Sequence, residues 1–213
     1  MNRILEECVG RYPALSVCLP AMESALGVLL EAFRGGHRLL ICGNGGSAAD
    51  AGHIAGELMK SFLLPRALPA EMAGALGAMG EDGAYLLSHL EGGVPVISLC
   101  AHEALMTAIA NDTAAQTIFA QQVTALGSAG DVLLAISTSG NSANCVYAAV
   151  AAKAKGMRVL SMTGAGGGRL APLSDAAIMV PEAETYKVQE AHLPIYHALC
   201  AAVEAAFWGA QSY

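Results

Sequence analysis

Residues 38–50 read Arg38-Leu39-Leu40-Ile41-Cys42-Gly43-Asn44-Gly45-Gly46-Ser47-Ala48-Ala49-Asp50. An apolar run ends in a glycine-rich turn, and an alanine-rich amphipathic segment follows, so the pattern predicts a strand, a loop and the start of a helix. Glycines let the backbone adopt positive φ and approach a ligand closely. The helix start offers unpaired N–H groups and the positive end of its dipole to an anion. The stretch therefore predicts a site for a phosphorylated small molecule.

The spacing of these glycines argues against the common nucleotide-binding loops. The third glycine that the dinucleotide motif G-x-G-x-x-G requires is missing, and no Gly-Lys-Ser/Thr follows to form a P-loop. We therefore expect the bound phosphate to belong to a ligand other than a nucleotide.

A second loop of the same design follows the apolar run from Asp131 to Ile136. It reads Ser137-Thr138-Ser139-Gly140-Asn141-Ser142, and its four hydroxyl side chains and backbone amides at a helix start can surround a phosphate without a lysine. Either loop alone is more typical of a serine-rich helix cap. Two such loops, both at strand-to-helix junctions, favour a phosphate site. We call residues 43–47 the glycine loop and residues 137–142 the hydroxyl loop.

Apolar runs without alternation, separated by helical stretches, predict a buried parallel sheet of five strands. The runs are residues 38–42, 94–100, 131–137, 157–163 and 176–180. We expect an α/β fold, a three-layer doubly wound sandwich that binds ligands beyond the carboxyl ends of its strands. Residues 1–35 show helical stripes and predict N-terminal helices. Residues 63–93 are irregular and predict a turn region with one or two helices.

The composition suits a single domain, residues 1–213, with residues 1–35 as an added helical arm used in oligomerisation. Hydrophobic residues make up 54% of the chain and charged residues only 14%. Because no run of about eighteen continuous apolar residues occurs, we expect no membrane span. The surplus of apolar surface predicts contact with another subunit.

The charge balance argues against nucleic-acid binding. The net charge is −7, and the eleven lysines and arginines are scattered along the chain. Six cysteines without C-x-x-C spacing predict reduced thiols. Acidic residues near the N-terminus leave no room for the apolar core of a signal peptide, so the expected location is the cytoplasm.

Two predicted helices carry residues that suit acid–base or metal chemistry. His53 and Glu57 are four residues apart on the helix after the glycine loop, so their side chains share one face, although such a pair is often only a solvated ion pair. The last helix, residues 187–208, carries Gln189, His192 and His197. Helical periodicity alone does not decide which of the two histidines belongs to a site.

The joint pattern of these motifs resembles the phosphoheptose isomerases, a branch of the sugar isomerase (SIS) domain family. The shared features are Gly43-Asn44-Gly45-Gly46-Ser47-Ala48-Ala49-Asp50 with His53 and Glu57, the hydroxyl loop, and Gln189-Glu190 with His197. They occur in the right order over nearly the whole chain. The resemblance selects His197 and leaves His192 as a structural residue. Pro194 is a departure, because a proline inside a helix can bend it between Gln189 and His197.

The resemblance implies an isomerase that converts sedoheptulose 7-phosphate into D-glycero-D-manno-heptose 7-phosphate by proton transfer through an enediolate. Glu57 is then the base and His197 the acid. The implied zinc ligands are His53, Glu57, Gln189 and His197. A loosely held metal would let Glu57 serve both as ligand and as base. The implied substrate-binding residues are Asn44, Gly45, Gly46, Ser47, Asn111, Asp112, Ser137, Thr138, Ser139, Ser142 and Gln189.

A second interpretation remains open at this point. A relative within the same branch keeps the fold and acts as a non-enzymatic partner of the bacterial replication initiator, so a phosphosugar-binding or regulatory protein is the alternative. The resemblance also implies a homotetramer with active sites completed across subunits. In that arrangement His53 and Glu57 of one chain would meet Gln189 and His197 of another.

Overall fold

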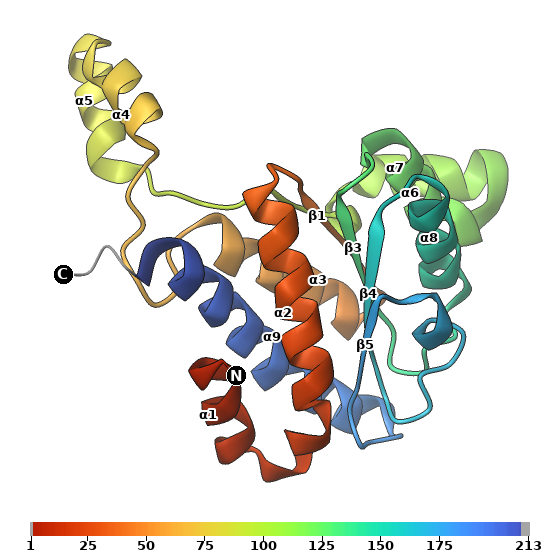
Figure 1. Ribbon diagram of the computed structural model, residues 1–213. Coiled ribbons are helices and arrows are strands. Elements are labelled where there is room, and N and C mark those ends of the chain that lie inside the picture. The colour runs from red at the N-terminus through yellow and green to blue at the C-terminus, as the bar shows by residue number, and fades with distance from the viewer. Residues whose placement is uncertain (1, 210–213) are drawn as a thin grey trace.

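The computed structural model describes residues 2–209 and shows a five-stranded parallel sheet between two layers of helices (Figure 1). The strand order is β2-β1-β3-β4-β5. The strands are β1 (Leu39–Cys42), β2 (Val96–Ser98), β3 (Val132–Ile136), β4 (Arg158–Thr163) and β5 (Ala176–Met179). All five predicted strands are present, which confirms the predicted α/β sandwich.

The position of β1 beside β3 determines where a ligand can bind. In the parallel register Leu39 pairs with Val96 of β2 on one side and with Val132 of β3 on the other. The chain moves from β1 outward to β2 and then returns to β3 on the opposite side, so its direction across the sheet reverses between β1 and β3. Ligands of doubly wound sheets bind at such a reversal, beyond the carboxyl ends of the strands. The glycine loop follows β1 and the hydroxyl loop follows β3, so both lie at this point.

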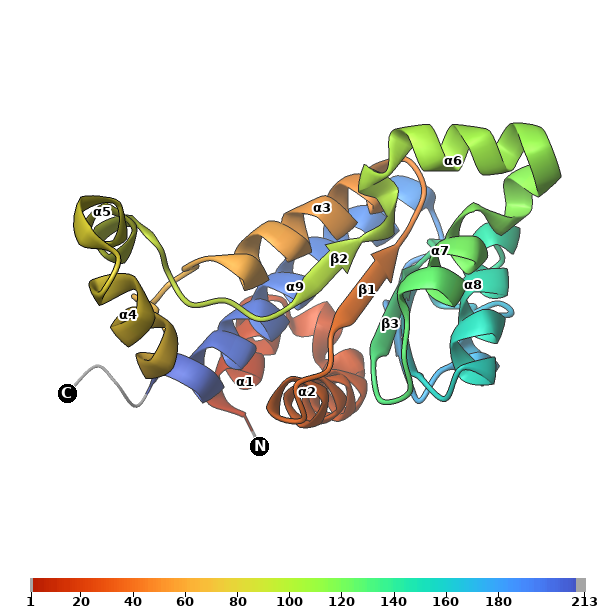
Figure 2. The same cartoon turned by 90° about the horizontal axis from the view of Figure 1, so that it is seen from above.

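Each face of the sheet packs against its own apolar cluster, because successive strand residues point to opposite faces. One cluster joins Ile41 and Leu134 to α2, α3 and α9, and the other joins Leu40 and Leu133 to α7 and α8. Figure 2 shows α3 and α9 on one side of β1 and β3, and α7 and α8 on the other. These helices are α2 (Leu19–Arg34), α3 (Gly46–Met59), α7 (Ile118–Leu126), α8 (Ala143–Ala154) and α9 (Thr185–Trp208).

The N-terminal arm contains α1 (Arg3–Arg11), a 3₁₀ turn (Pro13–Cys18) and α2. Leu5 of α1 and Met22 of α2 are fully buried in the cluster that also contains α9. The predicted apolar stripes therefore belong to the core of this chain. Use of the arm in oligomerisation stays a prediction.

One helical segment among the described residues, Pro13–Arg34, is long and apolar enough to cross a membrane by length and composition, with a mean hydropathy of 1.6. Core helices often meet the same criterion, because their buried face is apolar. Here Leu26, Leu29 and Phe33 are buried in the core of the sandwich. The apolar character of this segment is therefore explained by packing within the chain.

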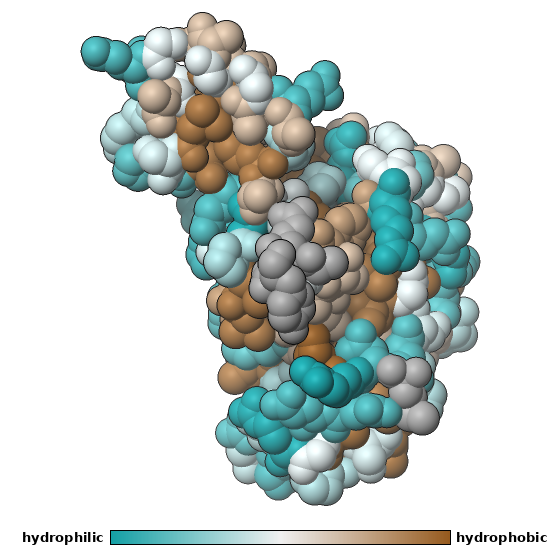
Figure 3. Space-filling view, turned by 60° about the vertical axis from the view of Figure 1, so that its left-hand side comes forward, coloured by the Kyte–Doolittle hydropathy of each residue, from teal (hydrophilic) through white to brown (hydrophobic). Residues whose placement is uncertain are grey.

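Residues 70–89 form two helices that stand apart from the sandwich (Figure 1). They are α4 (Ala70–Gly77) and α5 (Gly80–His89), and we call them the helical hairpin. The two helices approach closely at Gly83, where a Cβ atom would collide with the carbonyl oxygen of Leu76. Figure 3 shows an apolar patch on this hairpin, and Met79 and Tyr85 are among its exposed residues. The structure thus confirms the one or two helices that the sequence predicts within residues 63–93.

Candidate active site

The glycine loop and the hydroxyl loop are joined by two asparagines. The Nδ2 atom of Asn44 donates to Oδ1 of Asn144 at 3.0 Å, and Nδ2 of Asn144 donates to Oδ1 of Asn44 at 2.7 Å. Asn144 lies in the first turn of α8, so this pair connects the starts of α3 and α8. Gly45 has a φ of +57°, which an L side chain rarely adopts, and it is the N-cap residue of α3, which begins at Gly46. Two helix N-termini therefore lie beside each other at the carboxyl ends of the strands.

The hydroxyl loop is held in a compact turn by its own side chains. Ser137 is buried, and its Oγ lies 2.9 Å from Oγ of Ser142, which is the N-cap residue of α8. Ser139 is exposed, and its Oγ accepts a hydrogen bond from the Asn141 N–H at 3.2 Å. The hydroxyls of the loop therefore gather at a helix N-terminus, where an anion is stabilised.

A glycine cluster, residues 164–168, packs against the hydroxyl loop. The Gly164 N–H donates to the Thr138 carbonyl at 2.9 Å. Gly140 and Gly168 approach so closely that a Cβ atom on either one would collide with the backbone of the other segment. The structure gives the cluster a structural role, because only glycine permits this close approach.

Three of the predicted reactive side chains lie together. Nε2 of His53 lies 3.1 Å from Oε1 of Glu57 and 3.4 Å from Nε2 of His197. His53 and Glu57 come from one face of α3 and His197 from α9, and these two helices pack side by side. The Glu57 side chain is 17% exposed and that of His53 is 42% exposed, so both reach solvent. We call these three residues the reactive cluster.

The structure contradicts the expectation that His53 and Glu57 meet Gln189 and His197 of another subunit. His197 contacts His53 within one chain. Gln189 also lies near this chain's own glycine loop, because a Cβ atom on Gly46 would collide with its Nε2. The cause is the packing of α3 directly on α9, which brings His197 to His53 and Gln189 to the glycine loop without a partner.

The surroundings of His197 favour its neutral form. Burial lowers the pKa of His197, the neighbouring His53 lowers it further, and the Glu57 carboxylate opposes the shift. A neutral imidazole still carries one N–H. It can therefore polarise a substrate oxygen as a hydrogen-bond donor and protonate it when negative charge develops there.

His192 has the structural role that the resemblance implies. It is fully buried, and its Nε2 donates to the Thr163 carbonyl at 3.3 Å. Burial lowers the pKa of His192 to about 4, and the hydrogen bond to Thr163 opposes this shift. The predicted bend does not interrupt α9, which continues through Pro194 to Trp208.

The donor atoms of the reactive cluster suit zinc in kind and spacing. Ligands on a tetrahedral zinc at about 2.0–2.1 Å lie about 3.3 Å from each other, which is close to the two separations around His53 Nε2. Among residues 2–209, however, no group of three or more His, Cys, Asp or Glu side chains is already arranged around one metal position. A bound ion would replace the direct contacts of His53 with Glu57 and His197. Gln189 lies at the glycine loop, and no hydrogen bond joins it to the cluster in the described part of the chain.

Three predicted binding residues have other surroundings than expected. Asn111 and Asp112 lie in a π-helical turn (Ala110–Ala114) after α6 (Glu103–Ile109). Both are exposed, and Nδ2 of Asn111 donates to Oδ1 of Asp112 at 2.7 Å. No hydrogen bond joins them to either loop within residues 2–209. Ser47 is buried, and its N–H donates to the Asn44 carbonyl. This hydrogen bond stabilises the turn of the glycine loop.

A buried ion pair that the sequence analysis missed fixes the end of α3. Nε of Arg66 donates to Oε1 of Glu204 at 2.8 Å, and the two side chains are 0% and 1% exposed. Arg66 also donates to the carbonyls of Leu58 and Glu57, both at 2.7 Å. Glu204 accepts the N–H groups of Phe62, Leu63 and Leu64. The one available signal was Glu204 itself, a single charged residue in an otherwise apolar helical stretch.

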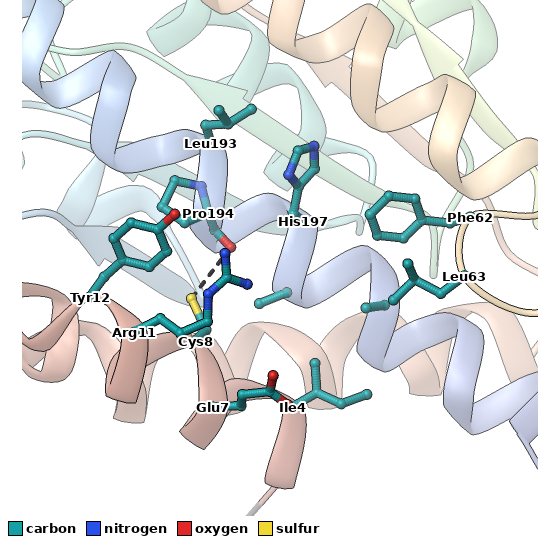
Figure 4. Close-up of a pocket in the computed structure, with 12 residues that line it drawn as sticks. Ile4, Glu7, Cys8, Arg11, Tyr12, Phe62, Leu63, Leu193, Pro194 and His197 are labelled. Carbon is teal, nitrogen blue, oxygen red and sulfur yellow. Dashed lines mark hydrogen bonds between the residues drawn. The ribbon is translucent and has the colours of Figure 1, made fainter.

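A groove between α1 and α9 borders the reactive cluster (Figure 4). Its volume is about 300 Å³, and it is lined by apolar residues, by His197 on one side and by Glu7 and Arg11 of α1 on the other. Figure 4 shows the His197 ring on α9, facing away from α1. The ring therefore belongs more to the cluster with His53 than to this groove.

Comparisons with known proteins identify the family of this chain. Residues 92–164 match the family model of the SIS domain. A phosphoheptose isomerase of Rhodospirillum rubrum is 40% identical over 190 residues, which cover 89% of this chain and 88% of that protein. A phosphoheptose isomerase of Helicobacter pylori is 38% identical over 96% of this chain and 95% of its own length.

Solved structures give the same result. The structure of a phosphoheptose isomerase from Neisseria gonorrhoeae matches with a TM-score of 0.73 at 32% identity and covers 94% of both chains. The one from Francisella tularensis matches with a TM-score of 0.74 at 29% identity and covers 93% of both chains. These similarities extend over nearly the full length of each partner and are not limited to one shared segment. The chain belongs to the phosphoheptose isomerase family.

Proposed function

We propose that this protein is an isomerase that interconverts sedoheptulose 7-phosphate and D-glycero-D-manno-heptose 7-phosphate. The observation that carries the proposal is the reactive cluster on the helix that begins at the glycine loop. His53 is seven residues beyond Gly46, which corresponds to about 10 Å along α3. An extended seven-carbon sugar phosphate has a similar length. It can therefore place its phosphate at the loops and its first two carbons at the cluster.

The reaction moves one proton between C1 and C2 through an enediolate, and each participant has a candidate. Glu57 is the base that removes the proton, and His197 donates to the oxygen on which negative charge develops. Ser137, Thr138, Ser139 and Ser142, with the start of α8, hold the phosphate and fix the open chain. Asn44, Gly45, Gly46 and Gln189 line the space between.

Turnover of sedoheptulose 7-phosphate in D₂O tests the proposed function. An enediolate mechanism predicts the aldose product with deuterium at C2, because the carbon-bound proton exchanges through the base. Absence of product at micromolar enzyme would contradict the proposal. The alternative, a regulatory protein that binds phosphosugars without turnover, is not favoured, because the relatives described above are phosphoheptose isomerases over nearly their whole length.

We also propose that the protein binds one zinc ion through His53, Glu57, His197 and Gln189. A zinc ion held there would polarise the oxygens of the sugar. Elemental analysis is expected to find up to about one zinc per chain in the wild type and much less in His53→Ala. The exposed His89 of the hairpin gives a matched control, since His89→Ala removes an imidazole far from the cluster. Equal zinc in wild type and His53→Ala would contradict this ligand set.

Ser139→Ala is expected to weaken substrate binding by about 1.5–3 kcal/mol, the contribution of one hydrogen bond to a charged group. KM should rise about tenfold or more while kcat changes little, because Ser139 contacts the phosphate and not the reacting carbons. Ser88→Ala in the hairpin is the control. Inorganic phosphate should compete with the substrate in the wild type, and unchanged KM in Ser139→Ala would remove this residue from the phosphate site.

We propose a cytoplasmic homotetramer, which light scattering at micromolar concentration would detect as four chains. The support is the apolar composition of the chain and the exposed apolar residues of the hairpin, among them Met79 and Tyr85. Because Glu57 and His197 both contact Nε2 of His53 within one chain, mixed tetramers of Glu57→Gln and His197→Ala chains should regain no activity. A monomer would contradict the assembly, and recovered activity would contradict the assignment of both residues to one chain.

A further inference from the structure

Helices α3 and α9 are connected at two places, and Glu57 takes part in both. The Glu57 carboxylate lies 3.1 Å from Nε2 of His53, and the same nitrogen lies 3.4 Å from Nε2 of His197 on α9. The backbone carbonyl of Glu57 accepts a hydrogen bond from Nη2 of Arg66 at 2.7 Å, and Nε of Arg66 donates to Oε1 of Glu204 on α9 at 2.8 Å. We call this second connection, from Glu57 through Arg66 to Glu204, the buried link.

The buried link is rigid because every nitrogen of the guanidinium has a fixed partner. Nε donates to Glu204, Nη2 to the Glu57 carbonyl, and Nη1 to the Leu58 carbonyl at 2.7 Å. The side chains of Arg66 and Glu204 are 0% and 1% exposed, and the centroid of the Trp208 ring lies 4.7 Å from Cζ of Arg66. A guanidinium is planar and holds its donors in a fixed fork, so it fixes the positions of the carbonyls that it binds.

The end of α3 needs partners of this kind. Glu57 lies two residues before Met59, the last residue of the helix. The last carbonyls of a helix have no partner within it, and helix ends fray. Arg66 binds two of these carbonyls and also Glu204, so the turn that carries Glu57 is held relative to α9 and not only relative to the rest of α3.

Glu204 extends the buried link to a residue beside His197. Its Oε1 atom also accepts the Phe62 N–H at 2.8 Å, and the centroid of the Phe62 ring lies 5.5 Å from that of the His197 ring (Figure 4). Glu204 is seven residues after His197 on α9, so the two lie on the same face, about two turns apart. The ion pair therefore contacts the supports of both proposed catalytic residues, the backbone of Glu57 and the Phe62 ring beside His197.

We propose that Arg66 and Glu204 are positioning residues for the isomerase reaction, which hold the Glu57 carboxylate where it removes the carbon-bound proton and keep the Phe62 ring against His197. The inference rests on the proposed function, because it takes Glu57 as the base and His197 as the donor. A misplacement of about 1 Å in an active site can lower the rate about a hundredfold. The buried link therefore affects the rate of the reaction as well as the stability of the fold.

Arg66→Lys tests this inference by steady-state kinetics with sedoheptulose 7-phosphate. Lysine keeps the charge beside Glu204, but one nitrogen does not replace three nitrogens that point to different partners. We expect kcat to fall about tenfold to a hundredfold. KM should change little, because the phosphate is held by the hydroxyl loop at the start of α8. Glu204→Gln keeps an oxygen for the backbone N–H groups but loses the charge, so it should lower kcat less and also leave KM unchanged.

Val123→Ala is the matched control for a loss of stability. Val123 is fully buried in α7 and belongs to the apolar cluster on the opposite face of the sheet, so its truncation destabilises the core away from the buried link. A purely structural role of the ion pair would lower stability in all three variants and leave kcat of the folded protein unchanged. We expect unchanged kcat only in Val123→Ala. Wild-type kcat in folded Arg66→Lys and Glu204→Gln would overturn the inference.

Hydrogen exchange of the same proteins needs no substrate and separates this inference from the proposed function. The amide groups in the last turn of α3, residues 56–59, should exchange faster in Arg66→Lys, relative to the rest of the chain, than in the wild type and Val123→Ala. Unchanged exchange at these residues would contradict the inference even in an active enzyme. A wild type without turnover would contradict the proposed function instead, and the exchange rates would still show whether the buried link holds the end of α3.

Discussion

Glu57→Gln and His197→Ala are each expected to lower kcat for sedoheptulose 7-phosphate by about a hundredfold or more, the usual effect of losing a general base or acid. Glutamine keeps the size of Glu57 but cannot accept the carbon-bound proton. Alanine at His197 removes the group that donates to the developing enediolate. Because both side chains are partly open to solvent, neither substitution leaves a cavity in the core. Steady-state kinetics of each purified variant measures the effect.

Two variants of the helical hairpin are matched controls for this experiment. Glu71→Gln and His89→Ala make the same chemical changes at exposed positions of α4 and α5. Both should keep wild-type kinetics. A correctly folded Glu57→Gln or His197→Ala protein that turned over substrate at near the wild-type rate would show that the role of that residue is assigned wrongly.

The sheet is predictable from the sequence because its signal is local. The apolar run at Leu39–Cys42 is too short for a core helix, and glycines end it, so it is recognisable as a buried strand. The hairpin gives no such signal. Its helices are rich in Ala, Gly and Met and bury little within this chain, so no apolar stripe marks them. Their existence was predicted there, but their separation from the sandwich was not.

The candidate site is predictable only as far as its residues lie on one element. His53 and Glu57 share a face of α3 by helical spacing alone. The contact between His53 and His197 depends on how α3 crosses α9, and this packing contradicts the expectation that His53 meets His197 of another subunit. The hydroxyl of Tyr196 lies 3.0 Å from Nδ1 of His53 and donates to Oδ1 of Asp50 at 3.2 Å. The sequence gives no sign of these contacts, because Asp50 and His53 are far from Tyr196 along the chain.

The ion pair of Arg66 and Glu204 could not be predicted from the sequence at all. The two residues are 138 positions apart, and Arg66 stands in an irregular segment between α3 and the hairpin. A lone arginine in such a segment is ordinarily a solvated side chain. Only the fold shows that this arginine fills the end of α3, where helical carbonyls have no partners within the helix. The pair thus connects the base of the hairpin to the turn that carries Glu57.

Glu204→Ala is expected to lower the free energy of unfolding by about 3–5 kcal/mol, because it leaves the Arg66 charge buried without a partner. It also leaves the N–H groups of Phe62, Leu63 and Leu64 without their acceptor. Folded proteins are stable by only about 5–15 kcal/mol, so this loss is a large fraction of the total. Denaturant titration of wild type and variant measures it. Glu31→Ala is the matched control, since Glu31 pairs with Arg158 at 3.9 Å but is 79% exposed, and its loss should cost about 1 kcal/mol or less.

The double variant Arg66→Met with Glu204→Leu separates the two contributions to this loss. Removing both charges together abolishes the cost of an unpaired buried ion, and such replacements are often neutral or stabilising elsewhere. Here Glu204 also accepts three backbone N–H groups, and Arg66 donates to the carbonyls of Leu58 and Glu57. In the double variant the three N–H groups and the Glu57 carbonyl lose these partners, whereas the Leu58 carbonyl keeps the hydrogen bond from the Val94 N–H, so only part of the stability should return. Full recovery would mean that the pair acts through its charges alone and that the end of α3, with Glu57 on it, keeps its position without Arg66.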